Sequence, residues 1–169
     1  MKKILCSLMV ITSLIACETK TNTAANNFPV NATGYNLDSS DNIVAVKKAI
    51  DAGMHSDTAE AKLVYADTAT VYDNKTKQTL AENMQMSNFF KTKGATIKVD
   101  KINFIWESVN NKEDANGVKN FVFVYMDASV TKGDKKVVVG INAVFAFKNG
   151  KIVTEWDTYD SAPIMDLIK

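Results

Sequence analysis

Apolar positions recur at helical spacing in the first half of the chain. A polar run at residues 38–41 offers side chains that cap a helix N-terminus, and the apolar stripe that follows it ends before Gly53. Ser56 or Asp57 can cap a second helix, which runs through residues 63–65. These two patterns predict a pair of short helices at the start of the domain.

A third amphipathic helix is predicted over residues 79–90, and Gly94 follows it as the residue that ends the helical pattern. Between the second and third helices, residues 69–72 read as a short strand that ends in the turn-forming run 73–75. The apolar side chains of the third helix that we expect to point inward are Leu80, Met84 and either Phe89 or Phe90.

After Gly94 the period changes from helical to alternating. Four strand-like segments follow, over residues 97–109, 118–131, 136–147 and 152–159. The segments between them carry turn chemistry, at residues 110–112, 132–134 and 148–150. Helices come first and an antiparallel meander comes last, which predicts an α+β domain with the helices on one face of the sheet.

Two of these strands carry apolar residues on both faces. This pattern is typical of strands that are buried on both sides. In the strand over 136–147 we expect Phe145 and Phe147 to point inward. In the strand over 118–131 we expect the aromatic row to point inward and the aliphatic row to form an outer surface that a partner could cover. The inner row is Phe121, Phe123 and Tyr125, and the outer row is Val122, Val124 and Met126.

The N-terminus has the three parts of an export signal. Two lysines precede an apolar run at residues 4–15, which is too short to span a membrane, and Ala16 then stands before Cys17. This arrangement resembles a bacterial lipobox, in which the cysteine is lipidated and becomes the first mature residue; an ordinary secretory signal with an incidental cysteine is the alternative. Several acyl chains on one residue suffice for stable anchoring. We therefore expect a lipid-anchored protein of the bacterial cell envelope.

The domain boundaries follow from these patterns. Residues 1–17 are the predicted lipoprotein signal peptide, and residues 18–38, rich in Thr, Asn and Ala, are a predicted flexible tether. The folded domain is predicted over residues 39–162, with a tail at residues 163–169.

Composition removes several classes of function. The formal net charge is +1, with acidic and basic residues interspersed, which argues against nucleic acid as a partner. Cys6 lies in the predicted signal peptide and Cys17 would carry lipid, so neither a disulfide nor a thiol nucleophile is expected. His55 is the single histidine, and no phosphate loop or dinucleotide fingerprint is present. We therefore expect no metal and no cofactor.

Two local motifs resemble the nuclear transport factor 2-like superfamily, and its SnoaL-like branch in particular. Residues 65–73, YADTATVYD, are similar to that family's helix-to-strand segment, and residues 147–152, FKNGKI, to its last hairpin. The resemblance covers residues 41–160 and implies a cone-shaped, cystatin-like fold, in which three N-terminal helices pack on a strongly curved, mainly antiparallel sheet around a pocket. Some members of this family are isomerases, cyclases or dehydratases, and many have no known activity.

The resemblance places Asp73 where ketosteroid-isomerase-like members keep a carboxylate base. Those members also carry a Tyr and an Asp that stabilise the enolate, and Val46 and Ala143 stand at the matching positions here. Steroid-type isomerisation is therefore disfavoured, because each missing donor costs about 3 kcal/mol of transition-state stabilisation. Asp73 can equally be a turn residue that bonds its own backbone before Asn74.

The last strand carries a second candidate. Period two places Glu155, Asp157 and Tyr159 on one face, and matching the hairpin to the family turns that face into the cone. Asp157 follows a Trp, as the catalytic acid does in SnoaL-like cyclases, so Asp157 with Asp73 forms the candidate catalytic pair. Two neighbouring buried carboxyl groups raise one pKa, which suits acid–base chemistry. The alternative is a wet cone mouth with ordinary solvated carboxylates.

These observations leave three hypotheses about function. The first is an envelope lipoprotein without catalytic activity whose pocket binds a small apolar molecule or a peptide. The second is a SnoaL-like enzyme that performs acid–base chemistry on a small organic substrate. The third is an assembly module that docks through the outer face of its sheet, including docking to a second copy as a homodimer. The pocket-lining candidates are Tyr72, Trp106, Tyr125, Phe145, Glu155 and Tyr159.

Overall fold

The computed structural model of the chain describes residues 34–169, and the predicted signal peptide, Cys17 and most of the predicted tether lie outside them. The described elements are five helices and seven strands in a mixed order. They are β1 (Tyr35–Leu37), α1 (Asp41–His55), α2 (Thr58–Val64), β2 (Tyr65–Asp73), β3 (Thr76–Thr79), α3 (Leu80–Asn83), α4 (Met86–Thr92), β4 (Ala95–Val109), β5 (Asn120–Lys132), β6 (Lys135–Lys148), β7 (Lys151–Thr158) and α5 (Ala162–Ile168).

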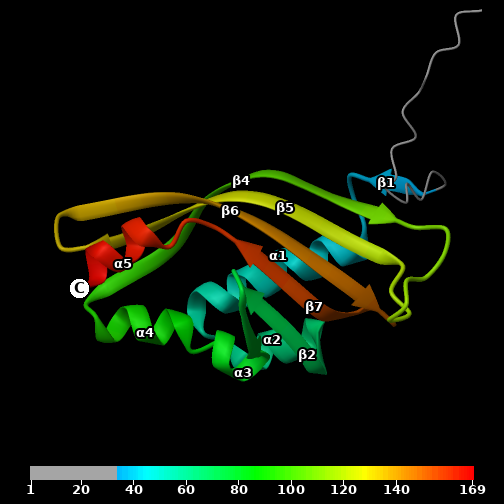
Figure 1. The fold of residues 1–169 in the computed structure, drawn as a ribbon, viewed down its shortest axis with the longest axis horizontal. Coiled ribbons are helices and arrows are strands. Elements are labelled where there is room, and N and C mark those ends of the chain that lie inside the picture. The colour runs from blue at the N-terminus through cyan, green and yellow to red at the C-terminus, as the bar shows by residue number, and fades with distance from the viewer. Residues whose placement is uncertain (1–33) are drawn as a thin grey trace, which may run out of the picture. The chain divides into compact units, whose positions relative to one another are not determined.

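All the described strands belong to one sheet with the order β1-β4-β5-β6-β7-β2-β3. Strands β4 to β7 form the predicted antiparallel meander, whereas β2 pairs with β7 in parallel. The sheet curls without closing, and α1 lies against its inner face (Figure 1). The predicted α+β fold class is confirmed.

Side-chain caps start α1, α2 and α3 where the sequence predicts helices to begin. The Ser40 hydroxyl accepts a hydrogen bond from the Ile43 amide at 3.0 Å, and the Asp57 carboxylate accepts from the first amides of α2. Thr79 and Glu82 form a reciprocal capping box at the start of α3. The third predicted helix is not continuous, however, because the chain leaves α3 after Asn83 and starts α4 at Met86.

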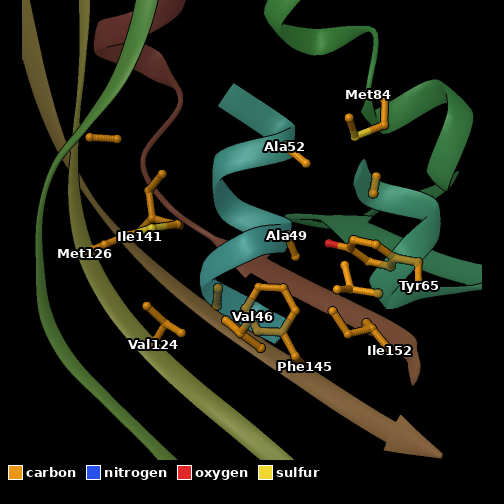
Figure 2. Close-up of a cluster of buried hydrophobic side chains, with 14 of the residues drawn as sticks. Val46, Ala49, Ala52, Tyr65, Met84, Val124, Met126, Ile141, Phe145 and Ile152 are labelled. Carbon is orange, nitrogen blue, oxygen red and sulfur yellow. The ribbon is translucent and has the colours of Figure 1, made fainter. Parts of the chain in front are cut away.

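The core lies between α1 and the inner face of the sheet. Val46, Ala49 and Ala52 form the buried stripe of α1, and Figure 2 shows them between Met126 and Ile141 on one side and Tyr65 and Ile152 on the other. Burial of this apolar surface is the main force that holds the helices on the sheet.

The prediction for the two faces of β5 is wrong. Val122, Val124 and Met126 are at most 6% exposed and belong to the core, whereas Phe121, Phe123 and Tyr125 lie on the outer face, half-buried. The strand register explains why the even-numbered side chains of β5 point inward. Val122 pairs with Phe145 on β6 and with Glu107 on β4, and both of these side chains are buried. Phe145 and Phe147 point into the core as expected.

The fold extends beyond the predicted domain at both ends. Residues Tyr35–Leu37, which the sequence places in the tether, pair with the end of β4. The predicted tail forms α5, whose Ile164 and Ile168 are buried. Among residues 34–169, the helices are all too short or too polar to cross a bilayer.

Candidate functional site

A partly enclosed cavity of about 100 Å³ lies between α1, α4 and the inner face of the sheet. Its walls are mostly aliphatic and methionine side chains, among them Ile50, Met54, Met84, Met126, Ile141 and Ile164. An engineered apolar cavity of about 150 Å³ accepts benzene, so a volume of this size suits a molecule of a few heavy atoms or the end of a longer one.

The acidic side chains of the cavity cluster where β2 ends beside β7, whereas the polar Asn83 and Ser87 come from α3 and α4. Because these two strands run parallel, Asp73 lies opposite Asp157, and Val71 lies opposite Glu155. Period two along β7 then directs Glu155 and Asp157 to the same side, so three carboxyl groups line one part of the cavity. Tyr65 and Tyr159 add two phenol hydroxyls to the same lining.

Tyr65 and Glu155 form a buried hydrogen bond. The Tyr65 hydroxyl donates to Glu155 Oε2 at 2.5 Å, and both side chains are at most 9% exposed. Burial raises the pKa of Glu155 to about 7, although the hydrogen bond from Tyr65 opposes the rise. Burial, followed by the nearby Glu155 carboxyl group, holds the pKa of Tyr65 well above its ordinary value, so the phenol stays protonated.

Asp157 and Asp73 complete the acidic part of the cavity. Burial, with the neighbouring Glu155 and Asp73 carboxyl groups, raises the pKa of Asp157 well above its ordinary value. Asp73 Oδ1 is shielded from solvent and has no hydrogen-bond partner in the described part of the chain. Burial and then the Asp73 charge raise the pKa of Tyr159 as well. An unpaired buried oxygen is uncommon and calls for a donor.

The turn after β2 holds this arrangement in place. Asn74 has a left-handed backbone, with φ 52°, and its amide donates to the Asp157 carbonyl at 2.8 Å. Its side-chain oxygen accepts from the Tyr159 amide at 3.1 Å. The turn role that the sequence suggested for this region therefore falls to Asn74, which leaves the Asp73 side chain facing the cavity.

The lining is acidic and hydroxylic, with no lysine or histidine among the described residues that form it. No group of three metal-ligating side chains with suitable geometry occurs in residues 34–169. Burial raises the pKa of Glu155 to about 7 and also raises that of Asp157, and a raised pKa favours the protonated carboxyl group, which can donate a hydrogen bond. The cavity also holds oxygens that accept hydrogen bonds, so the arrangement can bind a donor or move a proton.

The structure brings together only part of the site that the sequence suggested. Asp73, Asp157, Glu155 and Tyr159 all line the cavity, from two strands and the segment after β7. Phe145 is 1% exposed, but it packs within the core away from the cavity lining. The prediction that Phe145 lines the pocket is therefore wrong, and its side chain is part of the hydrophobic core.

Three other pocket candidates lie on the outer face of the sheet, so their predicted placement is corrected. Tyr72 stacks on Trp156 with ring centroids 6.1 Å apart, Trp106 stacks on Phe123 at 5.5 Å, and Tyr125 stacks on Phe104 at 6.3 Å. The reason for Tyr72 is the period of the strand, because Tyr72 and Asp73 are neighbours and must face opposite sides. The same period places Trp106 outside, because its neighbour Glu107 is buried on the inner face.

Sequence reasoning missed two buried groups. Tyr65 was assigned to the end of a helix, whereas it is the first residue of β2 and faces Glu155. Glu107 on β4 is 1% exposed and accepts hydrogen bonds from the side-chain amides of Asn42, at 2.7 Å, and Asn120. Neither position has a local signal, because the partners are far away in the sequence.

Comparison with protein-family models gives no match, and comparison with curated proteins gives none either. Several solved structures are similar in fold. A nuclear transport factor 2-like protein of unknown function from Burkholderia pseudomallei is 17% identical, with a TM-score of 0.55 over 78% of this chain and 99% of that chain.

Two further similar structures are named for an enzyme class. A proposed polyketide cyclase from Pseudomonas putida is 11% identical, with a TM-score of 0.52 over 78% of this chain and 100% of that chain. An LEH-like epoxide hydrolase from Mycobacterium tuberculosis is 17% identical, with a TM-score of 0.51 over 75% of this chain and 86% of that chain. At such identities the likeness establishes architecture alone, and residues 34–169 therefore have the nuclear transport factor 2-like fold.

Proposed function

We propose that the cavity binds a small, largely apolar molecule that carries one hydrogen-bond-donating group. The observation that carries this proposal is the uneven lining, apolar over most of its surface and oxygen-rich where β2 meets β7. The unpaired Asp73 Oδ1 gives the donor of the ligand an acceptor that no described side chain occupies. The apolar walls supply affinity, and the carboxyl groups supply orientation.

The test compares butan-1-ol with its isomer 1-methoxypropane, which has the same heavy atoms but no donor. We expect the alcohol to bind the full chain about tenfold more tightly, because one hydrogen bond to a buried acceptor contributes about 1.5 kcal/mol. Asp73→Ala should abolish that preference, and Asp67→Ala, an exposed position on the same strand, should leave it unchanged. Titration followed by NMR reports both affinities. Equal binding of the two isomers, or binding of neither, would contradict the proposal.

A second candidate function is acid–base catalysis in the same cavity. The specific observation is that Glu155 and Asp157 both have raised pKa values at one site, the first to about 7. An ionised carboxylate could then take a proton from carbon next to a carbonyl while a protonated carboxyl group donates a hydrogen bond to the developing enolate oxygen. Of the similar structures, the proposed polyketide cyclase is consistent with such chemistry.

Deuterium exchange into butan-2-one tests the catalytic candidate without a known substrate. The full chain should accelerate exchange of the protons next to the carbonyl, and Asp157→Asn should remove at least nine-tenths of the acceleration with little change in melting temperature. Asp160→Asn, three residues further on and exposed, is the matched control. Exchange at the buffer rate would leave the cavity as a binding site only.

The N-terminal sequence supports a further part of the proposal, that the domain is carried on a lipoprotein of the bacterial cell envelope. Cys17 would be lipidated and would become the first mature residue when residues 1–16 are removed. In a bacterial host, Cys17→Ala should move the full chain from the membrane fraction to the soluble fraction. Cys6→Ala is the control and should leave it with the membrane. An identical distribution of both variants would contradict lipid anchoring.

A further inference from the structure

A surface groove adjoins the cavity on the side away from β2. It lies between α1, α4 and the first half of β4, and has a volume of about 620 Å³. Its lining includes five aliphatic or methionine side chains, namely Ile50, Met54, Ile97, Val99 and Ile102. The groove is therefore apolar along much of its surface although it is open to solvent.

The charges in this groove are mainly positive. Lys47, Lys91 and Lys98 come from three different elements, and all three side chains are exposed. Asp51 is the single acidic residue in the lining, and it lies 3.5 Å from His55 Nδ1. Lys98 also lies 3.9 Å from Asp100, outside the groove, which leaves Lys47 and Lys91 as the main cations. This sign is opposite to that of the carboxyl-lined part of the cavity.

The groove and the cavity share part of their linings. Ile50, Met54, Ser87 and Ile97 belong to both, so these four residues separate the groove from the cavity. Met54 is unbranched and adapts its shape readily, so a movement of its side chain can open a way between them. Lys47 and Lys91 lie on α1 and α4, on either side of the groove.

We propose that groove and cavity together bind a single-chain amphiphile with an anionic carboxylate head, whose head lies near Lys47 and Lys91 and whose tail enters the cavity. The proposal rests on the proposed ligand-binding function and names the class of ligand. Charge complementarity selects the anionic head, and the apolar floor selects the chain. The cavity of about 100 Å³ has room for the end of one chain, which favours a free carboxylate over a two-chain lipid.

The first experiment is a titration of the full chain with hexanoate, octanoate and decanoate. Affinity should rise about fourfold with each added methylene until the tail fills the cavity, because each methylene leaves water on binding. Octanoate binding should also weaken as salt is raised, whereas octan-1-ol binding should not. An affinity that is independent of chain length would overturn the proposal.

The second experiment reverses the charge in the groove. The double variant Lys47→Glu, Lys91→Glu should weaken octanoate binding at least tenfold and leave octan-1-ol binding within twofold. The matched control is Lys48→Glu, Lys93→Glu, which makes the same change in net charge on the same two segments outside the groove lining. All four lysines are exposed, so both variants should keep the melting temperature of the parent chain.

The outcomes separate this proposal from the function on which it rests. Equal octanoate affinity in the groove variant and its control would overturn the proposed site for the anionic head. The preference for butan-1-ol over 1-methoxypropane would still test the proposed ligand site in the cavity. If the parent chain binds octanoate as expected but shows no preference for butan-1-ol, the proposed acceptor at Asp73 is contradicted and the groove proposal stands. Binding to phosphatidylglycerol vesicles without binding to octanoate would show a membrane surface as the partner and overturn the free carboxylate.

Discussion

The two faces of the curled sheet carry different chemistry on the same strands. The inner face, towards α1, is aliphatic and holds four carboxyl groups, those of Glu107, Glu155, Asp157 and Asp73. The outer face holds stacked aromatic rings and leaves Phe104 62% and Trp106 40% exposed. Four acidic side chains thus lie inside and several large apolar ones outside, the reverse of what their residue types alone suggest.

The outer aromatic residues are held by one another rather than by a core. The register places Trp106 beside Phe123, Phe123 beside Val144 and Val144 beside Trp156, and Trp156 pairs in turn with Tyr72. Cross-strand pairs of this kind stabilise a sheet by about 0.2–1 kcal/mol each. The inner carboxyl groups, by contrast, depend on protonation or on hydrogen bonds. The outer face is therefore stabilised by contacts within the sheet, and the inner face by the charge and hydrogen bonding of its carboxyl groups.

The largest expected effect comes from placing a charge on each face of β5. Val124→Glu should abolish cooperative folding or lower the free energy of unfolding by more than about 4 kcal/mol, because it buries an unpaired carboxylate in the core. Phe123→Glu, the neighbouring outer position, should cost about 1 kcal/mol. Urea unfolding measures both. If the two variants lose a similar free energy of unfolding, the assignment of one face of β5 to the core and the other to the outer surface is wrong.

The second effect is a dependence of stability on pH that arises inside the cavity. The pKa of Glu155 is about 7 in the folded state against 4.5 for the ordinary residue, so the folded state binds more protons between these pH values. Stability should therefore fall as pH rises through that window, by about 3 kcal/mol for this group. Asp157, whose pKa is also raised, acts in the same direction.

Glu155→Gln tests the origin of this dependence. The variant cannot ionise at this position but keeps an oxygen that accepts from Tyr65, so its free energy of unfolding should vary less between pH 4.5 and pH 8. Glu113→Gln, in an exposed turn, should vary as the parent chain does. Urea unfolding at both pH values gives the comparison. A parent chain that becomes more stable towards pH 8 would show that the cavity carboxyl groups are solvated and ionised.

A smaller effect is expected at the other inner carboxylate. Glu107→Ala should lower the free energy of unfolding by about 2–3 kcal/mol, since it leaves the amides of Asn42 and Asn120 without their acceptor. Ser108→Ala, the next residue along β4, is the control and should cost much less. A double-mutant cycle between Glu107→Ala and Asn42→Ala should give a coupling energy of about 1 kcal/mol or more. A coupling near zero would mean that α1 is held on β4 by apolar packing alone.

The smallest effect on stability, and a large one on assembly, is expected on the outer face. We propose that two copies of the chain meet there through the exposed aromatic residues. Trp106→Ser with Trp156→Ser should cost only about 1–2 kcal/mol of folding stability but convert a dimer to a monomer in light scattering. Phe89→Ser, an exposed ring on α4, is the control and should leave the dimer intact. A parent chain that is already monomeric would remove the assembly hypothesis.

Local patterns predicted the elements that depend on local forces. The caps at Ser40, Asp57 and Thr79 mark helix starts because each side chain bonds to amides within three residues of itself. The four long strands and their turns were placed to within a few residues. The break after Asn83 and the strand β1 were missed, and α5 was missed despite Pro163 and the helical spacing of Ile164, Leu167 and Ile168.

The candidate site was predictable only in part. Period two alone grouped Glu155, Asp157 and Tyr159, and it could also have excluded Tyr72 once Asp73 was chosen. The sequence also indicates which face of β5 is buried. The row of Val122, Val124, Met126, Ala128 and Val130 is apolar throughout, whereas the aromatic row turns polar at Asp127 and Ser129. A polar end marks the face that meets solvent.

The sequence by itself determined the longer helices and strands and, within uninterrupted stretches of strand, which side chains share a face, because these follow from bonding and periodicity within a few residues. Only the tertiary structure decided the register of β5 with β4 and β6, which fixes the buried face that the apolar row of β5 merely favours. It also decided that Tyr65 meets Glu155 and that Asp73 lies opposite Asp157. These pairs join residues more than 80 positions apart in the sequence, and they meet because β2 pairs with β7 in parallel.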